Sequence, residues 1–266
     1  MQKMQTMKRC QKMTFGVYGL LFLAVFLFQH TLACAKTKDV TTNPDAYFLK
    51  ADDVVDSMKL LPAPPQPGSA AFEFDEAMYQ HGMTLRNTPA GKKAAEDATN
   101  TIAQSVATFS DAFGHTISKD ATPAIFALSL KVMGDAGGLA PRAAKDAHAR
   151  IRPFAYHKAA TCNPRGQLLV HPRHSYPSGH SAFGWALALV LSEIHPERQN
   201  EILRRGLELG QGRVICGYHW QSDVDAGRVL AAAVVARLHA NATFMQGLAA
   251  AKEEFARLQQ TQSNSD

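Results

Sequence analysis

Past the middle of the chain the sequence is Ser181-Ala-Phe-Gly-Trp-Ala-Leu-Ala-Leu-Val-Leu-Ser-Glu-Ile194. At 3.6 residues per turn this segment is apolar on almost every side, which is typical of a helix buried in a protein interior. The segment from Val224 to His239 is strongly apolar as well. The two segments therefore predict a pair of buried helices at the centre of the fold.

Segments on both sides of this pair carry apolar residues at three- and four-residue spacing, which indicates amphipathic helices. One of them, 197–209, is expected to end at Gly210 and Gly212. We find no internal repeat and no convincing strand pattern, so we predict an all-α fold: a single compact helical domain with two central buried helices, over residues 36–266. The other expected helices are 70–85, 91–109, 122–133 and 139–151.

The first 35 residues have the pattern of a signal peptide. Four cations within the first 12 residues precede an apolar run over 15–28 and an Ala33-Cys34-Ala35 cleavage site. The apolar run is shorter than the roughly 20 residues of a spanning helix. Cleavage is therefore favoured over a membrane anchor, although a lipid on Cys34 is an alternative. We expect a periplasmic or secreted protein with no stable membrane insertion after cleavage.

Charge and cysteine content narrow the function further. The formal net charge of +5 falls to +1 once residues 1–35, with four cations and no acid, are removed. A nucleic-acid partner is not expected, because such proteins keep a surplus of cations.

After cleavage only Cys162 and Cys216 remain, and an exported compartment is oxidising. We predict that they form a disulfide; two buried free thiols are the alternative.

The first of three motifs with chemical potential is Lys145-Asp-Ala-His-Ala-Arg-Ile-Arg152-Pro153. On one continuous helix, residues seven apart differ by about 20° of rotation, so Lys145 and Arg152 would share a face. A guanidinium fork and a lysine point charge on one face could hold a phosphate. Taken alone, the segment is more typical of a solvated basic helix face.

The second motif, Tyr176-Pro177-Ser178-Gly179-His180, leads directly into the first apolar helix. A helix N-terminus offers unpaired backbone N–H groups and a dipole that favours an anion. Gly179 lets the backbone come close to a ligand, and His180 can give or take a proton near neutral pH. A capping serine followed by an ordinary histidine is the alternative.

The third motif is Arg213-Val-Ile-Cys-Gly-Tyr-His219-Trp-Gln-Ser-Asp223. On a helix the carboxylate of Asp223 would reach the ring of His219 four residues earlier. That contact would fix the tautomer and leave the other nitrogen as a nucleophile. Arg213 would point away on an unbroken helix, so we expect a bend at Gly217. An ordinary surface pair of His219 and Asp223 is the alternative.

In this order, Lys-x6-Arg-Pro, Pro-Ser-Gly-His and Arg-x5-His-x3-Asp resemble the motifs of the type 2 phosphatidic acid phosphatase superfamily, which also includes the vanadium haloperoxidases. More closely, the chain resembles the bacterial class A nonspecific acid phosphatases. The resemblance covers nearly all of the chain after residue 35. It rests on the three motifs, with Ser175 to His180 and Arg213 to Asp225 much as in those enzymes, and on Leu85-Arg-Asn-Thr88.

This resemblance implies a secreted acid phosphatase that hydrolyses a broad range of phosphate monoesters, such as nucleotides, sugar phosphates and aryl phosphates. Phosphate transfer to a second alcohol and assembly into a homo-oligomer are further expectations. The implied roles are His219 as nucleophile of a phosphohistidine intermediate, Asp223 as the residue that orients it, and His180 as general acid. The implied phosphate-binding residues are Lys145, Arg152, Ser178, Gly179 and Arg213.

One position departs from the family pattern, because Gly212 stands where a serine usually precedes the last arginine. The lost hydroxyl could weaken support of the site, or a neighbour could supply it. No metal and no other cofactor are expected, because three cations do a metal's work and would repel a divalent ion. His171 and His174 could suggest zinc, but with no nearby thiolate or carboxylate cluster we interpret them as loop residues.

Two other functions remain compatible with the sequence. Vanadate mimics phosphate, so the same residues would suit a vanadium-dependent haloperoxidase. A non-catalytic periplasmic module that binds phosphate or nucleotides would need the cations, but neither the His219–Asp223 pair nor His180. Loss of phosphatase activity in a His219 variant therefore distinguishes the enzyme from the binding module.

Overall fold

The computed structural model describes residues 46–98 and 101–263. The predicted signal peptide, 1–35, lies outside the described residues, and so does Cys34. In the described part all regular elements are helices and there is no strand, which confirms the predicted all-α class. The elements are α1 (Ser57–Leu60), α2 (Ala70–Leu85), α3 (Pro89–Asp97), α4 (Ile102–Ala107), α5 (Ser110–Phe113), α6 (Pro123–Met133), the π-helix η3 (Gly134–Leu139), α7 (Arg142–His148), α8 (Pro153–Tyr156), α9 (Pro164–Gln167), α10 (Gly179–Ile194), the 3₁₀-helix η4 (Pro196–Arg198), α11 (Gln199–Ile215), α12 (Gln221–His239) and α13 (Ala242–Ser263).

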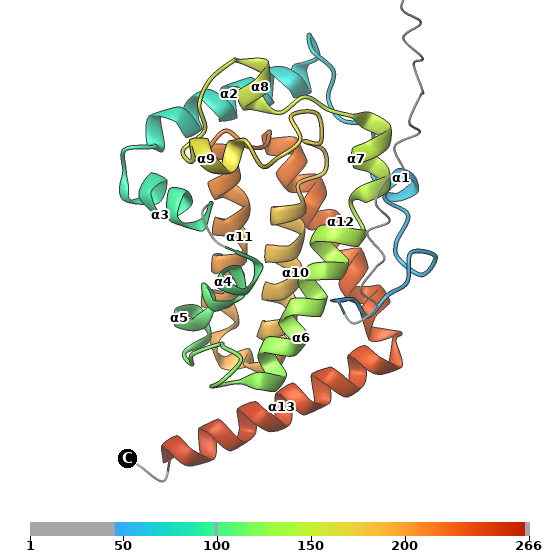
Figure 1. The fold of residues 1–266 in the computed structure, drawn as a ribbon, viewed down its shortest axis with the longest axis vertical. Helices are drawn as coiled ribbons and strands as arrows, with labels where there is room; N and C mark the ends of the chain where they lie inside the picture. The colour runs from blue at the N-terminus through green and yellow to red at the C-terminus, as the bar shows by residue number, and fades with distance from the viewer. Residues whose placement is uncertain (1–45, 99–100, 264–266) are drawn as a thin grey trace, which may run out of the picture. The chain divides into compact units, whose positions relative to one another are not determined.

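Helix α10 is the centre around which the others pack. It contacts α11, α12, η3, α6 and α13, and Figure 1 shows it between α11 and α6. Its side chains are buried on nearly every side, including Ala186, Leu187 and Leu191, which are inaccessible to solvent. The prediction of a central helix from its all-round apolar pattern is therefore confirmed.

Helix α12, the second apolar segment, is buried mainly along one side. Leu230, Ala231 and Val234 are inaccessible, whereas Val229 is 54% exposed. The face toward α10 belongs to the same hydrophobic core cluster as α10 itself. The pair of apolar helices therefore forms the core, with α10 more enclosed than α12.

Helix α11 continues through both glycines that were expected to end it, so that prediction was wrong. Small residues let it approach α10 closely: a Cβ at Gly206 would lie 2.6 Å from the Cβ of Ala188. Gly210 likewise faces the side chains of Ser181 and Val224 at about 3.2 Å. Close packing outweighs the roughly 1 kcal/mol that glycine costs a helix interior. The chain then turns at Gly217, where φ is +76°, as the sequence predicted.

The segment expected to be one helix over 139–151 is interrupted. The π-helix η3 precedes it, α7 covers only Arg142–His148, and Ala149 then adopts a left-handed conformation with φ +43° and ψ +41°. The shared helical face predicted for Lys145 and Arg152 is therefore wrong, because Arg152 lies beyond this break as the residue before α8. The segment 91–109 is likewise divided, into α3 and α4.

The predicted disulfide is confirmed. Cys162 and Cys216 are bonded, with their Cα atoms 4.7 Å apart, and the bond joins the loop before α9 to the end of α11. Separately, none of the helices within 46–98 and 101–263 is both long enough and apolar enough to cross a membrane.

Candidate active site

Three cations from different elements meet around the N-terminal end of α10. The Nζ of Lys145 donates to the carbonyl oxygens of His174, at 3.0 Å, and Pro177, at 2.5 Å. Arg152 Nη2 donates to the same carbonyl of His174 at 2.9 Å. The carbonyls of the loop before α10 thus hold Lys145 and Arg152 side by side, although the two do not share a helix.

Arg213, at the end of α11, completes the set of cations. Its guanidinium lies against the ring of Tyr218, with Cζ 4.0 Å from the ring centroid. Arg213 is only 5% exposed, and its buried Nε has no hydrogen-bond partner. A buried guanidinium with an unpaired donor is costly unless an anion satisfies it. This observation points to an anion-binding site, and we call Lys145, Arg152 and Arg213 the cation cage.

Burial lowers the pKa of all three cations of the cage. Burial, followed by the charge of Arg152, lowers the pKa of Lys145 to about 7. Burial lowers the pKa of Arg152 to about 10 and that of Arg213 to about 9. The two arginines therefore stay protonated at neutral pH, whereas Lys145 loses its proton as the pH rises through neutrality.

The N-terminus of α10 adds hydrogen-bond donors to the cage region. Ser178 is the N-cap, and its Oγ accepts from the N–H of Ser181 at 3.2 Å. The backbone of Ser178-Gly179 is pressed between two glycines. A Cβ at Gly179 would lie 2.6 Å from the carbonyl oxygen of Gly137 in η3, and one at Gly227 of α12 would lie 2.6 Å from that of Ser178. Glycine is therefore required here for close backbone approach.

His180 is the first histidine of the site and lies in the first turn of α10. Its ring contacts Phe183, with the centroids 5.2 Å apart. Burial, followed by the charges of Arg213, His219 and the other cage cations, lowers the pKa of His180 well below its ordinary value. These charge effects link His180 with His219 and all three cations in one site.

His219 lies in the turn between α11 and α12, not on a helix as the four-residue spacing suggested. Nη1 of Arg152 is 2.8 Å from His219 Nε2. A guanidinium has no acceptor, so Nε2 must be the acceptor and carries a lone pair. The proton of the neutral ring is therefore on Nδ1, which faces Asp223 Oδ2 at 3.5 Å. That distance is long for a hydrogen bond, so Nδ1 and Oδ2 must move slightly closer before the Nδ1 proton can be donated to Asp223.

Burial, followed by the charges of Arg152 and Lys145, lowers the pKa of His219 well below its ordinary value. The ring is therefore neutral even in mildly acidic solution, where a free histidine would be protonated. A neutral imidazole with an unprotonated Nε2 inside a cation cage is suited to attack an electrophilic phosphorus atom.

Four supporting residues were not found by sequence reasoning: Asp75, Arg150, Ser175 and Ser222. The Oγ of Ser175 donates to Asp223 Oδ2 at 2.5 Å. Arg150 binds both Asp223 and Asp75 at 2.7 Å. Their partners lie 48 to 147 residues away along the chain, so no local pattern marks them. In the sequence Arg150 resembles any other cation of a basic segment.

The departure at Gly212 has a structural explanation. A Cβ at this position would face Ala94 of α3 at 3.3 Å, so it lies at the contact between α11 and α3. A glycine here eases helix packing.

The rings of His171 and His174 stack with their centroids 4.1 Å apart. No group of three or more potential metal-ligating His, Cys, Asp or Glu side chains occurs in the described part of the chain.

Comparison with known proteins agrees with this geometry. Residues 123–244 match the model of the PAP2 superfamily, a range that contains the cation cage, both histidines and Asp223. A non-specific acid phosphatase of Providencia stuartii is 54% identical over 220 residues, which cover 83% of this chain and 89% of the relative. A non-specific acid phosphatase of Salmonella typhimurium is 38% identical over 237 residues, covering 89% of this chain and 91% of the relative.

A third relative, an acid phosphatase of Zymomonas mobilis, is 30% identical over 199 residues, or 75% of each chain. The similarity to all three therefore extends well beyond the motifs. The chain belongs to the PAP2 superfamily and, within it, to the class A non-specific acid phosphatases.

Proposed function

We propose that this protein hydrolyses phosphate monoesters through a phosphohistidine intermediate on His219. The observation that carries the proposal is the state of this ring: Nε2 accepts from Arg152 at 2.8 Å, so it is unprotonated, while Nδ1 faces Asp223. The names of the relatives support the reaction class, because the Providencia and Salmonella proteins are non-specific acid phosphatases.

In this proposal the cation cage holds the phosphoryl oxygens. Lys145, Arg152 and Arg213 supply positive charge, and the Ser178 hydroxyl and Gly179 amide supply hydrogen bonds at the N-terminus of α10. Negative charge on the equatorial oxygens is stabilised by donors that are already in place. The unpaired Nε of Arg213 supports this role, because an incoming oxygen would satisfy it.

The reaction proceeds in two displacements. His219 Nε2 attacks phosphorus, the bond from phosphorus to the ester oxygen breaks, and His180 gives its proton to the leaving alcohol. Water then attacks phosphorus as His180 takes back a proton, the phosphorus–nitrogen bond breaks and phosphate is released. A second alcohol in place of water gives phosphate transfer. No step requires a metal, because the cage supplies the positive charge.

His180 has to be protonated to act as an acid, yet the cage lowers its pKa when no substrate is bound. A phosphate dianion between the cations offsets their charge and raises the pKa of the imidazole, because a nearby anion favours the charged form. Substrate binding therefore supplies the protonated His180 at the moment it is needed. Acidic solution favours the same state, which fits a proposed acidic optimum.

The proposal extends to breadth of substrate and to location. The cage recognises the phosphoryl group, the part that all phosphate monoesters share, so nucleotides, sugar phosphates and aryl phosphates are all expected substrates. The Cys162–Cys216 disulfide fits an oxidising compartment. Together with the signal-peptide pattern of residues 1–35, it supports a periplasmic or secreted enzyme.

Hydrolysis of p-nitrophenyl phosphate in the presence of EDTA tests the mechanism. The mature protein should turn over, His219→Ala should lose activity by several orders of magnitude, and His81→Ala, on the exposed side of α2, should match the wild type. Alkaline quenching during turnover should trap phosphate on the wild-type protein alone, because phosphohistidine survives in alkali. Activity that persists in His219→Ala, or that requires added metal, would contradict the proposal. Bromination by peroxide after vanadate loading would support the haloperoxidase instead.

A further inference from the structure

Asp223 does not stand alone behind His219, because a buried arginine holds its carboxylate from the other side. Arg150 Nη1 donates to Asp223 Oδ1 at 2.7 Å. The second oxygen, Oδ2, accepts from the Trp220 N–H at 2.8 Å and from Ser175, and it is the oxygen that faces His219. Together these hydrogen bonds hold the buried carboxylate in the orientation in which Oδ2 faces His219.

Arg150 is itself held by a second carboxylate. Its Nη2 donates to Asp75 Oδ2 at 2.7 Å, and its Nη1 also donates to the Ser222 hydroxyl at 2.7 Å. Asp75, an inaccessible residue of α2, in turn accepts from the Ser222 N–H at 2.8 Å and hydroxyl at 2.6 Å. The result is a continuous buried array of Asp75, Arg150 and Asp223 that ends at the ring of His219.

Without Arg150, only the Trp220 N–H and the Ser175 hydroxyl would hold the carboxylate of Asp223, and both bind Oδ2. The carboxylate would then be free to rotate about its Cβ–Cγ bond, and Oδ2 would lose its alignment with Nδ1 of His219. Arg150 prevents this rotation through Oδ1, and Asp75 fixes Arg150 in place.

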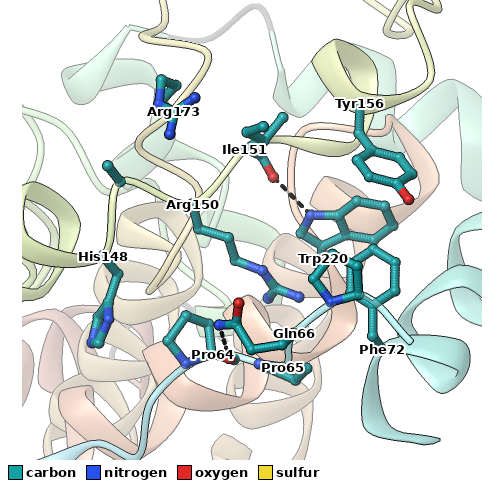
Figure 2. A pocket seen from close by; sticks show the side chains of 12 residues that line it. Pro64, Pro65, Gln66, Phe72, His148, Arg150, Ile151, Tyr156, Arg173 and Trp220 are labelled. Carbon is teal, nitrogen blue, oxygen red and sulfur yellow. Dashed lines mark hydrogen bonds between the residues drawn. The ribbon is translucent and has the colours of Figure 1, made fainter. Parts of the chain in front are cut away.

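The backbone is shaped to make this arrangement possible. The left-handed Ala149 ends α7, and the chain that follows sends Arg150 toward Asp223 and Arg152 toward His219. Figure 2 shows Arg150 beside Trp220, whose indole N–H donates to the Ile151 carbonyl at 2.9 Å. The two arginines on either side of Ile151 thus act on opposite sides of the His219 ring: Arg152 contacts Nε2, and Arg150 holds Asp223, which faces Nδ1.

We propose that Arg150 and Asp75 are positioning residues for the phosphatase reaction, acting on His219 only through Asp223. This inference rests on the proposed function of His219. Neither side chain touches the substrate in this scheme. Loss of either should lower kcat and leave oxyanion binding by the cage unchanged.

Three variants test the inference: Arg150→Gln, Asp75→Asn and Asp223→Asn. Arg150 borders a cavity of about 250 Å³, so a different side chain at this position has space. The matched control is Arg205→Lys, because Arg205 of α11 is similarly buried and pairs with Asp97 of α3 at 2.6 Å, with no contact to His219. For each folded variant we would measure kcat, KM and the inhibition constant of sulfate.

We expect Asp75→Asn to lower kcat about tenfold and Arg150→Gln about 100-fold, as for groups that orient a reacting side chain. Sulfate inhibition should stay within about twofold of the wild type, since the cage is intact. The decisive variant is the double Asp75→Asn/Asp223→Asn. Its kcat should equal that of Asp223→Asn alone, because a residue that acts only through Asp223 has no effect once Asp223 is changed.

Other outcomes would overturn the inference. These are a kcat for Asp75→Asn or Arg150→Gln equal to that of Arg205→Lys, equal losses of kcat and sulfate affinity, or additive effects in the double variant. If Arg150→Gln does not fold, Asp75→Asn and the double variant decide the matter. His219→Ala separates the two proposals: if it is inactive while Arg150→Gln and Asp75→Asn keep wild-type kcat, only the positioning role fails, and if His219→Ala stays active, the proposed function itself fails.

Discussion

Lys145 should make oxyanion binding by the cage depend on pH in a way that one substitution abolishes. Burial and Arg152 lower its pKa to about 7. A lowered lysine pKa means that the charge is present below that value and is lost as the pH rises through it. Anion affinity should therefore be greatest in acidic solution and decline above neutrality, whereas an ordinary lysine would hold its charge to about pH 10.

The magnitude follows from the titration. Above a pKa of about 7 the charged fraction falls tenfold per pH unit, so the inhibition constant of a fixed-charge anion should rise about 30-fold by about pH 8.5. The attraction between the charged Lys145 and a bound anion is strong enough to allow a change in affinity of this size. Two unit charges about 4 Å apart at an effective dielectric constant of about 20 attract by about 4 kcal/mol, close to a thousandfold in affinity.

Competitive inhibition by sulfate during p-nitrophenyl phosphate hydrolysis measures the effect, because sulfate remains a dianion across this range. Between about pH 7 and about pH 8.5 the wild type should show the rise. Lys145→Gln should bind sulfate weakly and with little pH dependence in this range, and Lys145→Arg should lose the dependence because arginine stays protonated here. Lys92→Gln, an exposed lysine of α3, is the control and should behave as the wild type. A flat wild-type profile to about pH 9, or an unchanged slope in Lys145→Gln, would refute the reasoning.

Other predictions concern stability and backbone fit. The double variant Cys162→Ser/Cys216→Ser should lose about 2–4 kcal/mol of unfolding free energy in urea, because the bond closes a long loop; an unchanged midpoint would contradict this. Ala149→Gly should gain about 0.5–1 kcal/mol by the same method, because glycine adopts the left-handed conformation without steric cost. A loss of stability would argue against strain at this position. Gly179→Ala should cost about 1–3 kcal/mol and lower kcat, because its Cβ would lie 2.6 Å from a carbonyl oxygen of η3; wild-type kcat would show that the backbone yields easily. Asp135 has a pKa raised by burial to about 6, so its stabilising contribution is full below about pH 4 and is lost as the pH rises through about 6. Asp135→Asn should therefore cost on the order of 3 kcal/mol more at about pH 4 than at about pH 7 in urea unfolding, and a pH-independent cost would refute this sign.

The helical core was predictable because its signal is local. Apolar residues on almost every side of 181–194 favour burial of the whole helix, and α10 is indeed buried on nearly every side. The three motifs were predictable for a related reason, since each is short and carries a distinctive set of side chains. What the motifs could not provide was geometry. Lys145 and Arg152 meet because loop carbonyls hold them, not because they share a helix.

The features that were missed depend on partners remote in the chain. Glycine at 210 and 212 looks like a helix end, and only the close packing of α11 against its neighbours keeps the helix intact. Arg150 looks like one more cation of a basic segment, and its role depends on Asp75 and Asp223, each more than 70 residues away. Local propensity cannot record such contacts, because they exist only after the chain has folded.

The disulfide also shortens the covalent path between Arg152 and His219. Cys162 lies ten residues after Arg152, and Cys216 lies three residues before His219. Through the bridge, Arg152 and His219 therefore stay near each other even in an unfolded chain, although 66 residues separate them along the backbone. The shorter path lowers the entropy cost of bringing them together by about 1.5 kcal/mol. Their effective concentration stays high whenever the protein unfolds with its disulfide intact, so the central contact of the site is favoured at the start of every refolding attempt.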